Sequence, residues 1–309
     1  MIGTDVSVAK KFLNSGQLVA IPTETVYGLA GNALQESTVL SIFKAKNRPS
    51  FDPLIVHISS TDWLTKLASE VPTKAKVLMD AIWPGPLTFI LPKTDLVPDI
   101  VTSGLSYVGI RMPRHPVTLS LLKNLDYPLA APSANPFSYV SPTTAQHVED
   151  QLGKKIPYIL DGGDSTIGLE STIISFENPQ KPSILRFGGI TQNEIESLIG
   201  PVSISLSNNS NPSAPGQLDK HYATTKKTYL VNQPYELLRF NVNVFCIGYG
   251  EALFEYNLSP TENLDEMAQQ LFKALRLADD SDKTEVAISL VPDDGIGKAI
   301  NDRIRRACH

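Results

Sequence analysis

The feature that most restricts the fold of this chain is an alternation of short apolar runs with longer amphipathic segments. Runs with the length of buried strands are 17–22, 53–58, 87–91, 107–111, 128–131, 157–160, 171–176 and 183–187. Segments with apolar residues at helical spacing are 5–16, 36–47, 72–83, 142–152 and 191–199, with a further helix from His115. This alternation predicts an α/β fold. Because the runs 171–176 and 183–187 adjoin without a helix between them, we expect a mixed sheet.

The composition and periodicity of the sequence change in the last third of the chain. The segment 205–225 is rich in Ser, Asn and Pro and shows no periodicity, which is typical of a linker. Beyond it, apolar runs again alternate with helical segments, at 262–278 and 297–307. We therefore expect a first α/β domain over 1–204, a linker over 205–225 and a small second α/β domain over 226–309.

Composition excludes several kinds of protein. Apolar residues make up 42% and charged residues 19% of the chain, as in ordinary globular proteins, and the net charge of −5 argues against bulk attraction to nucleic acid. The two cysteines, Cys246 and Cys308, form no CxxC motif, so neither a zinc site nor a disulfide framework is expected. No apolar run approaches the roughly 18 residues of a membrane span. Residues 1–16 read as an amphipathic helix, not a signal peptide, and we expect a cytoplasmic protein without membrane contact.

Positive charge is concentrated at the end of the helical segment 36–47. Lys44, Lys46 and Arg48 fall within five positions, directly before Pro49. Cations at a helix C-terminus complement the helix dipole, which is one explanation. The other is that Lys46 and Arg48 converge on one anion, since arginine offers a planar fork to phosphate and lysine a mobile point charge. A lone histidine on an apolar strand, such as His57, is more often a core residue than a ligand.

Polar side chains also gather directly after predicted strands, where open α/β sheets bind ligands. The segment 22–33 carries Thr23, Glu24, Thr25 and Tyr27, followed by glycines that form neither a dinucleotide fingerprint nor a P-loop. A hydroxyl-rich turn is the structural alternative for this segment. The segment 131–143 supplies Ser133, Asn135, Ser138 and Ser141, which suit hydrogen bonds to phosphate, ribose or base. For its end, the structural alternative is a helix N-cap at Ser141 or Thr143.

Two further arginines end predicted strands. Arg111 and Arg186 each need an anionic partner if they are buried, and either a structural carboxylate or a ligand would serve. Near the second, Glu170 could pair with a basic group or help to hold a metal, and Ser171 begins the strand 171–176. The sequence offers no Ser-His-Asp or Cys-His order and no pair of carboxylates for acid–base catalysis. Sites rich in Lys, Arg, Ser, Thr and Asn fit phosphoryl or nucleotidyl transfer, which depends on positioning and charge neutralisation.

These motifs together resemble the YrdC/Sua5 family of threonylcarbamoyl-AMP synthases. The segments that carry the resemblance, over about residues 5–200, are PTETVYGL (22–29), KAKNRP…DPLIVH (44–57), WPGPLTFIL (83–91), IRMPRHP (110–116), AAPSAN (130–135), SPT (141–143) and GLESTI…ILRFG (168–188). Their common order makes the match more specific than any one motif. The second domain after a linker resembles the longer, Sua5-type members.

The resemblance implies a fold and a reaction. The fold is a YrdC-like twisted mixed sheet with flanking helices and a concave, positively charged cleft, followed by a small Rossmann-like C-terminal α/β domain. The reaction is that of a nucleotidyltransferase, which converts L-threonine, bicarbonate or carbon dioxide, and ATP to L-threonylcarbamoyladenylate and pyrophosphate, with Mg²⁺ accompanying the ATP. The product would pass to a separate tRNA threonylcarbamoyl transferase complex that modifies adenosine 37. Direct tRNA binding and the ligands of the metal stay open.

The resemblance also implies residue roles. Lys46 and Arg48 would be catalytic. ATP contacts would fall on Arg48, Asp52, Tyr107, Ser133, Asn135, Ser141, Arg186 and Tyr222. Threonine contacts would fall on Thr25, His57, Arg111, Ala131 through its backbone, and Ser171. The linker would fold over the cleft as a lid. This chain departs from the family pattern at Asp52, where asparagine is common, at Tyr107, which replaces a smaller residue, and in the linker motif PGQLDKHYAT at 215–224.

Two other functions compete with this interpretation. The same domain occurs in hydrogenase-maturation carbamoyltransferases, but those carry a zinc-finger segment that two cysteines cannot supply. A non-catalytic, RNA-binding YrdC-like module would use the basic cleft without turnover. The sequence pI of about 5.6 favours the enzyme over that module.

Overall fold

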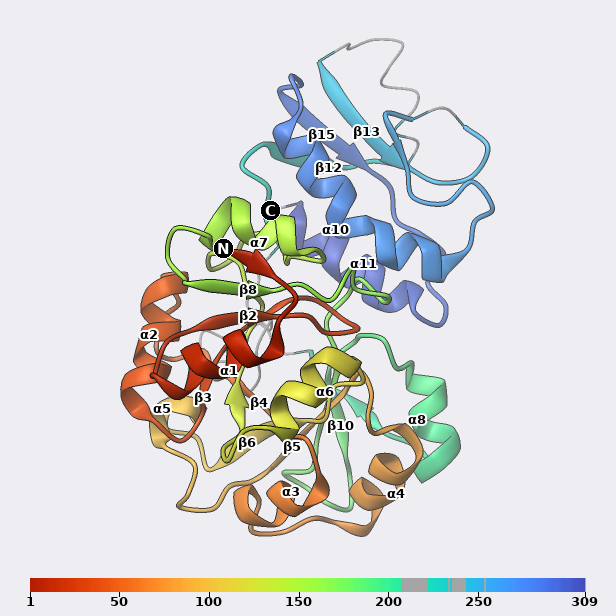
Figure 1. Ribbon diagram of the computed structural model, residues 1–309. Helices are drawn as coiled ribbons and strands as arrows, with labels where there is room; N and C mark the ends of the chain where they lie inside the picture. The colour runs from red at the N-terminus through yellow and green to blue at the C-terminus, as the bar shows by residue number, and fades with distance from the viewer. Residues whose placement is uncertain (207–221, 233, 235–242, 253, 309) are drawn as a thin grey trace.

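The computed structural model describes residues 1–206, 222–232, 234, 243–252 and 254–308. Two sheets organise these residues (Figure 1). The first has the strand order β1 (Ile2–Gly3), β8 (Tyr158–Leu160), β2 (Val19–Ile21), β3 (Gly28–Asn32), β7 (Leu129–Ala130), β4 (Ile55–His57), β6 (Tyr107–Arg111), β5 (Leu87–Pro92), β9 (Thr172–Ser175), β10 (Ser183–Arg186) and β11 (Ser203–Ile204). The helices of this first unit are α1 (Val6–Asn14), α2 (Glu36–Lys46), α3 (Thr61–Leu67), α4 (Thr73–Ile82), α5 (Asp99–Thr102), α6 (Pro116–Lys123), α7 (Ala145–Leu152) and α8 (Gln192–Ile199).

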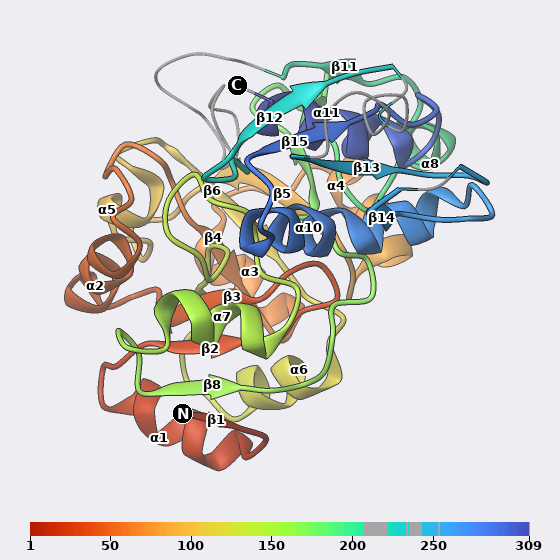
Figure 2. The same ribbon diagram turned by 90° about the horizontal axis from the view of Figure 1, so that it is seen from above.

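The second unit is smaller and all its described strands run parallel. Its sheet has the order β12 (Lys227–Leu230), β15 (Glu285–Ile288), β13 (Val244–Gly248) and β14 (Tyr256–Asn257). Its described helices are α10 (Leu264–Asp280) and α11 (Gly297–Ala307). Seen from above, α10 lies between this sheet and α7 of the first unit (Figure 2). The predicted small α/β unit after the linker is therefore present.

The mixed character of the first sheet is confirmed. β5 pairs with β6 antiparallel and with β9 parallel, and β4 pairs with β6 parallel. β9 and β10, which adjoin without a helix, are antiparallel neighbours. The parallel strands β4 and β6 end side by side, which brings His57 opposite Arg111 at the carboxyl ends of both strands.

Several element boundaries follow from local capping. The side chain of Asp5 accepts a hydrogen bond from the Ser7 amide, so the predicted N-cap of the first helix is confirmed. The alternative N-cap at Ser141 or Thr143 is wrong: α7 begins at Ala145, and its cap is Thr144, whose side chain accepts from the His147 amide. This leaves the Ser141 hydroxyl to other partners.

Strand β3 is an element that the sequence pattern did not predict. Its residues Gly28–Asn32 lie in the stretch interpreted as a glycine-containing loop. The glycines are present because neighbours approach the backbone closely: a Cβ at Gly31 would lie 2.5 Å from the Thr38 methyl group of α2. The strand thus gives up β-propensity for close packing against the helix.

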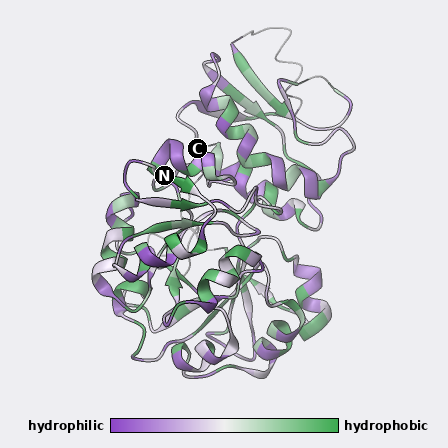
Figure 3. Ribbon diagram, in the orientation of Figure 1, coloured by the Kyte–Doolittle hydropathy of each residue, from purple (hydrophilic) through white to green (hydrophobic). Residues whose placement is uncertain are grey.

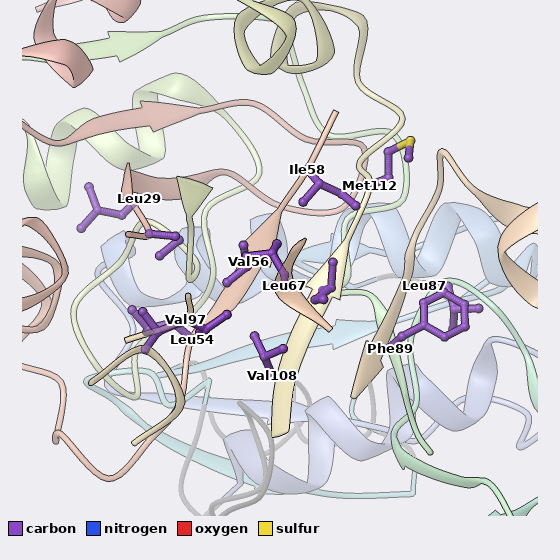
Figure 4. Close-up of a cluster of buried hydrophobic side chains, with 14 of the residues drawn as sticks. Leu29, Leu54, Val56, Ile58, Leu67, Leu87, Phe89, Val97, Val108 and Met112 are labelled. Atoms are coloured by element: carbon purple, nitrogen blue, oxygen red, sulfur yellow. The ribbon is translucent and has the colours of Figure 1, made fainter. Parts of the chain in front are cut away.

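The apolar core lies between the first sheet and its helices. The largest cluster of buried side chains includes Leu54, Val56, Phe89 and Val108, which converge from β4, β5, β6 and the loop before β4 (Figure 4). The strands are mainly apolar along their length, whereas the helices carry polar residues on their outer faces (Figure 3). Among the described residues, no helix is both long and apolar enough to span a bilayer.

Candidate active site

A hollow opens where strand ends of the first sheet meet the residues after the linker. The space between its atoms is about 560 Å³, its open mouth included. Its lining comprises Thr23, Thr25, Val26, Gly28, Arg48, Ile55, His57, Arg111, Ala131, Pro132, Ser133, Glu170, Ser171, Arg186 and Tyr222. We call this hollow the central cavity. It unites five of the segments in which the sequence concentrates polar residues.

Most predicted site residues line the central cavity, and some do not. All the predicted threonine contacts line it: Thr25, His57, Arg111, Ala131 and Ser171. Among the predicted ATP contacts, those in the lining are Arg48, Ser133, Arg186 and Tyr222. The predicted residues outside the lining are Lys46, Asp52, Tyr107, Asn135 and Ser141. The roles of all these residues stay predictions.

Arg111 at the end of β6 has a structural carboxylate as its partner. Its Nη2 atom lies 2.8 Å from Oε1 of Glu24, and both side chains are buried. Its Nη1 atom donates to the Thr25 hydroxyl at 2.8 Å, and its Nε atom donates to the Gly85 carbonyl at 3.3 Å. A buried arginine with several fixed partners presents its remaining N–H groups in one orientation. Glu24 is therefore a structural carboxylate partner of Arg111, one of the two kinds of partner that the sequence allowed.

Arg48 is fixed in the same way by Asp52. Its Nη2 atom lies 2.9 Å from Oδ2 of Asp52, and its Nε atom donates to the Asp52 carbonyl at 3.0 Å. Nη2 also donates to the Pro53 carbonyl at 2.9 Å. Burial raises the pKa of the Asp52 carboxyl, while the charges of Arg48 and Lys46 oppose that shift. Asp52 thus touches an arginine of the central cavity and does not itself line the cavity.

Lys46 lies beneath the loop that follows β7. Its Nζ atom donates to the backbone carbonyls of Ser133 and Asn135, and its side chain is only 1% exposed. Burial, and then the charge of Arg48, lowers the pKa of Lys46 well below its usual range. The Asn135 amide also turns to backbone carbonyls, those of Pro136 and Tyr139. In this geometry Lys46 shapes the loop that brings Ser133 to the cavity.

Ser171 and Arg186 meet at the far wall of the central cavity. The Arg186 guanidinium donates from Nε to the Ser171 carbonyl and from Nη2 to the Ser171 hydroxyl, both at 3.1 Å. The same hydroxyl lies 2.8 Å from the hydroxyl of Thr88 on β5. Burial lowers the pKa of Arg186 to about 10, so the group stays cationic at neutral pH. The strand-end arginine therefore orients a hydroxyl of the cavity.

His57 and Tyr107 both take largely structural positions. The His57 ring is 3% exposed, and its Nδ1 atom lies 3.3 Å from the Ile55 carbonyl. Burial, helped by the charge of Arg111, lowers the pKa of His57 to about 3, so the ring is neutral at physiological pH. Tyr107, at the start of β6, packs on the apolar cluster that contains Ile90.

Glu170 joins the two units of the chain. Its Oε1 atom accepts from the Ser141 hydroxyl at 2.5 Å, and its Oε2 atom lies 3.1 Å from Nε of Arg303 on α11. Sequence reasoning missed Arg303, although a signal existed. It falls on the buried face of 297–307, one turn from Ile300 and next to Ile304, where a charge needs a buried partner. Of the two functions considered for Glu170, pairing with a basic group is observed.

Tyr222 is the first described residue after the linker. The predicted lid over 205–225 falls mainly on residues 207–221, which lie outside the described residues. Tyr222 itself is 1% exposed, has φ of 62° and stacks on Phe272 of α10 with ring centroids 5.3 Å apart. Its burial raises the pKa of the hydroxyl above its usual range, while Arg303 opposes that shift.

No group of three or more His, Cys, Asp or Glu side chains within the described residues could hold a metal ion by itself. The carboxylates near the central cavity, Glu24, Asp52 and Glu170, each contact an arginine. A divalent cation at this site would therefore depend on ligands supplied by a bound molecule, as Mg²⁺ with nucleotide phosphates often does.

Family models match nearly the whole chain. The Sua5/YciO/YrdC model, described as "Telomere recombination", matches residues 11–188. A second model, described as "Threonylcarbamoyl-AMP synthase, C-terminal domain", matches residues 190–308. The chain belongs to the Sua5/YciO/YrdC family. The second match identifies it as a two-domain, Sua5-type member, as the sequence motifs indicate.

Relatives of this family resemble the chain along its length. A protein of Pyrococcus abyssi named threonylcarbamoyl-AMP synthase is 39% identical, with 98% of this chain and 93% of the relative covered. One of Bacillus subtilis with the same name is also 39% identical, over 98% and 92% of the two chains. The crystal structure of P. abyssi Sua5 in complex with L-threonine superposes with a TM-score of 0.91 at 39% identity, covering 98% of this chain and 94% of that one. The predicted fold class is confirmed.

Proposed function

We propose that this protein is an L-threonylcarbamoyladenylate synthase that uses L-threonine, bicarbonate or carbon dioxide, and ATP. One observation carries the proposal: the central cavity combines an arginine held by a carboxylate and a hydroxyl, at Arg111, with two further buried arginines, Arg48 and Arg186. An amino-acid carboxylate and a nucleotide phosphate chain are the anions that such an arrangement would hold together. The Sua5-type relatives support the choice of reaction.

Threonine would bind at the end of the cavity formed by β3, β4 and β6. The N–H groups of Arg111 that remain beside Glu24 would take its carboxylate, and the hydroxyls of Thr25 and Ser171 would meet its hydroxyl or amine. His57 would provide a neutral wall, because its low pKa keeps the imidazole uncharged. The complex of P. abyssi Sua5 with L-threonine supports threonine as a substrate.

ATP would bind toward Arg48, Ser133, Arg186 and Tyr222. The two guanidinium groups would neutralise phosphate charge as pyrophosphate leaves, because cations already in place need no reorganisation during the reaction. Ser133 lies on the loop that Lys46 holds from below, so Lys46 would act partly through the position of this loop. Mg²⁺, bound with the ATP phosphates, would supply further charge neutralisation.

The reaction needs positioning more than proton transfer. The threonine amine first combines with bicarbonate to form a carbamate, with loss of water. A carbamate oxygen then attacks the α-phosphorus in line: the new O–P bond forms as the bond to the pyrophosphate oxygen breaks. Holding the two substrates in contact converts this to an effectively unimolecular step. Burial of the reacting groups would protect a labile adenylate from water.

The product would pass to a separate tRNA threonylcarbamoyl transferase complex, and we propose that both act in the cytoplasm, where ATP and tRNA meet. Direct binding of tRNA to this chain is not part of the proposal, since the net charge of −5 gives no bulk attraction to RNA.

The test is ATP turnover with purified protein. We expect pyrophosphate release only when threonine and bicarbonate are both present, in the presence of Mg²⁺. Lys46→Ala and Arg48→Ala should each abolish most of it, whereas Lys44→Ala, an exposed lysine of the same helix end, should retain it. A protein that binds RNA with steep salt dependence and shows no turnover would be a binding module and would contradict the proposal.

A further inference from the structure

Arg303 is a fully buried arginine that reaches from the second unit into the first. It lies on α11, is 0% exposed, and its Nε atom donates to Oε2 of Glu170 at 3.1 Å. Its Nη1 atom donates to Oδ2 of Asp302 at 2.9 Å. Removing either member of a buried ion pair is costly, so the geometry of Glu170 depends on Arg303.

Glu170 transmits this contact to the central cavity. It lines the cavity, and its other carboxylate oxygen accepts from the Ser141 hydroxyl at 2.5 Å. A side-chain hydrogen bond to a fixed carboxylate selects one rotamer of the serine. Arg303 of the second unit thereby sets the orientation of the Glu170 carboxylate and the Ser141 hydroxyl in the first unit.

The same guanidinium contacts a second cavity residue. Its Cζ atom lies 5.3 Å from the centre of the Tyr222 ring, on which it makes a cation–π contact. The ring also stacks on Phe272 of α10, at an interplanar angle of 24°. Tyr222 is therefore held between side chains of α10 and α11 while it lines the cavity.

A further set of contacts fixes the backbone beside Ser141. Arg276 of α10 donates to the Val140 carbonyl and, at 3.1 Å, to Oε1 of Gln151. The Tyr139 hydroxyl donates to Oδ2 of Asp279 on α10 at 2.6 Å. Both α10 residues act on the segment that precedes Ser141, so this segment and its serine are positioned from the second unit.

We propose that Arg303 is a positioning residue for the nucleotide and that the second unit completes the nucleotide end of the site through it. The inference rests on the proposed function, because it takes Glu170, Ser141 and Tyr222 as the surroundings of ATP. At the threonine end, the contacts of Arg111 go to Glu24, Thr25 and Gly85, and within the described part of the chain none of these is a contact of Arg303. Loss of Arg303 therefore acts more strongly on ATP than on threonine, although Ser171, a predicted threonine contact, adjoins Glu170 in the chain.

The test compares Arg303→Met with Arg303→Lys and with Arg305→Met, an exposed arginine of the same helix. The dissociation constants of ATP and of L-threonine are measured separately by calorimetry, with Mg²⁺ present. We expect Arg303→Met to weaken ATP binding by roughly tenfold or more, because Glu170 and Tyr222 lose the contacts that orient them at the nucleotide end of the site. Threonine binding should stay within about twofold, because Arg111 and Thr25 keep their partners. Arg303→Lys should restore part of the ATP affinity, and Arg305→Met should match the wild type.

A second pair of variants covers the case in which Arg303→Met does not fold, since it leaves Glu170 buried without this partner. Arg303→Met combined with Glu170→Gln removes both charges. We expect it to bind ATP at least about threefold more weakly than Glu170→Gln alone, because Tyr222 loses its cation–π contact. Equal ATP affinities in that comparison, or equal losses for ATP and threonine in folded Arg303→Met, would overturn the inference. A wild type that binds no ATP would overturn the proposed function as well.

Discussion

At the residue scale, three buried arginines in or beside the site are each oriented by a carboxylate. The pairs are Arg48 with Asp52, Arg111 with Glu24, and Arg303 with Glu170. Each carboxylate lowers the local positive charge and in return fixes the direction of the guanidinium N–H groups. Arg111 and the hydroxyls were predictable from their places at strand ends, and Arg48 from its place at a helix end. Arg303 was not predicted. The partners of these arginines were not predictable, because pairing across strands depends on the three-dimensional register, and Glu24 and Arg111 are far apart in the sequence.

Arg111→Ala should weaken threonine binding far more than ATP binding. The guanidinium lies among the residues predicted for threonine, and a lost charge-assisted hydrogen bond pair costs about 3 kcal/mol, or roughly a hundredfold in affinity. Separate dissociation constants for the two ligands measure this. The exposed Arg114 serves as a control, and Arg114→Ala should change neither constant. Equal losses for both ligands with Arg111→Ala would disprove its assignment.

His57 should make the folded protein sensitive to acid. Its pKa falls from 6.5 to about 3 on burial, so below pH 6.5 the unfolded chain binds a proton that the folded chain does not. Stability therefore falls as the pH drops through this window, by about 1.4 kcal/mol per pH unit for this group. In His57→Gln that loss is absent. Urea titrations at pH 6.5, 5.5 and 4.5 give the unfolding free energy of the wild type minus that of His57→Gln. This difference should fall steadily as the pH drops, and a constant difference would refute the pKa shift.

At the element scale, glycines let backbone segments pack closely, at Gly31 against α2 and at Gly188 against the wall of the site. The alternating pattern predicted most helices and strands of both units, and β6 and α11 match their expected spans. It missed β3, whose glycines avoid the Thr38 methyl group, and α3 (Thr61–Leu67), a short helix. Such elements are set by contacts that no periodicity records.

Gly188→Ala should disturb the wall that carries Glu170 and Ser171. A Cβ at Gly188 would lie 2.3 Å from the Glu170 carbonyl oxygen and from the Thr172 amide nitrogen, both backbone atoms. Because these backbone atoms can move apart only at a cost in free energy, we expect a loss of about 1–3 kcal/mol in unfolding free energy. Pyrophosphate release should fall at least about tenfold, since reacting groups tolerate little displacement.

The adjacent Gly189 offers a matched control. A Cβ there would meet side-chain atoms, among them two of Ile167, at 3.2 Å. Because Ile167 can shift, Gly189→Ala should be milder in both urea unfolding and turnover. If Gly188→Ala were as active as the wild type, the close approach at the wall would not matter for the site.

At the scale of the whole molecule, the two units share one apolar cluster. Val26, Val140 and Leu169 of the first unit are buried with Met267 and Leu271 of α10. The sequence indicated two units and a linker between them. It did not indicate this shared core, because the contributing residues of the first unit lie in three loops without an apolar pattern of their own.

The shared core predicts that the units unfold together. Both tryptophans, Trp63 and Trp83, lie in the first unit, so their fluorescence reports that unit, whereas circular dichroism reports both. The two urea midpoints should coincide in the wild type. Leu169→Ala, at the junction, should cost about 2–5 kcal/mol of unfolding free energy and so lower both midpoints. The exposed Leu277 of α10 is the control, and Leu277→Ala should leave both midpoints in place. Two separate transitions in the wild type would contradict the shared core.

The central claim is that one cavity holds threonine against the innermost phosphorus of ATP. A crystal structure with L-threonine and a non-hydrolysable ATP analogue tests it most directly. We expect the threonine carboxylate beside Arg111, and the α-phosphate between the threonine amine and the guanidinium groups of Arg48 and Arg186. A nucleotide bound outside the central cavity, or a threonine amine separated from the α-phosphate by protein side chains, would contradict the account.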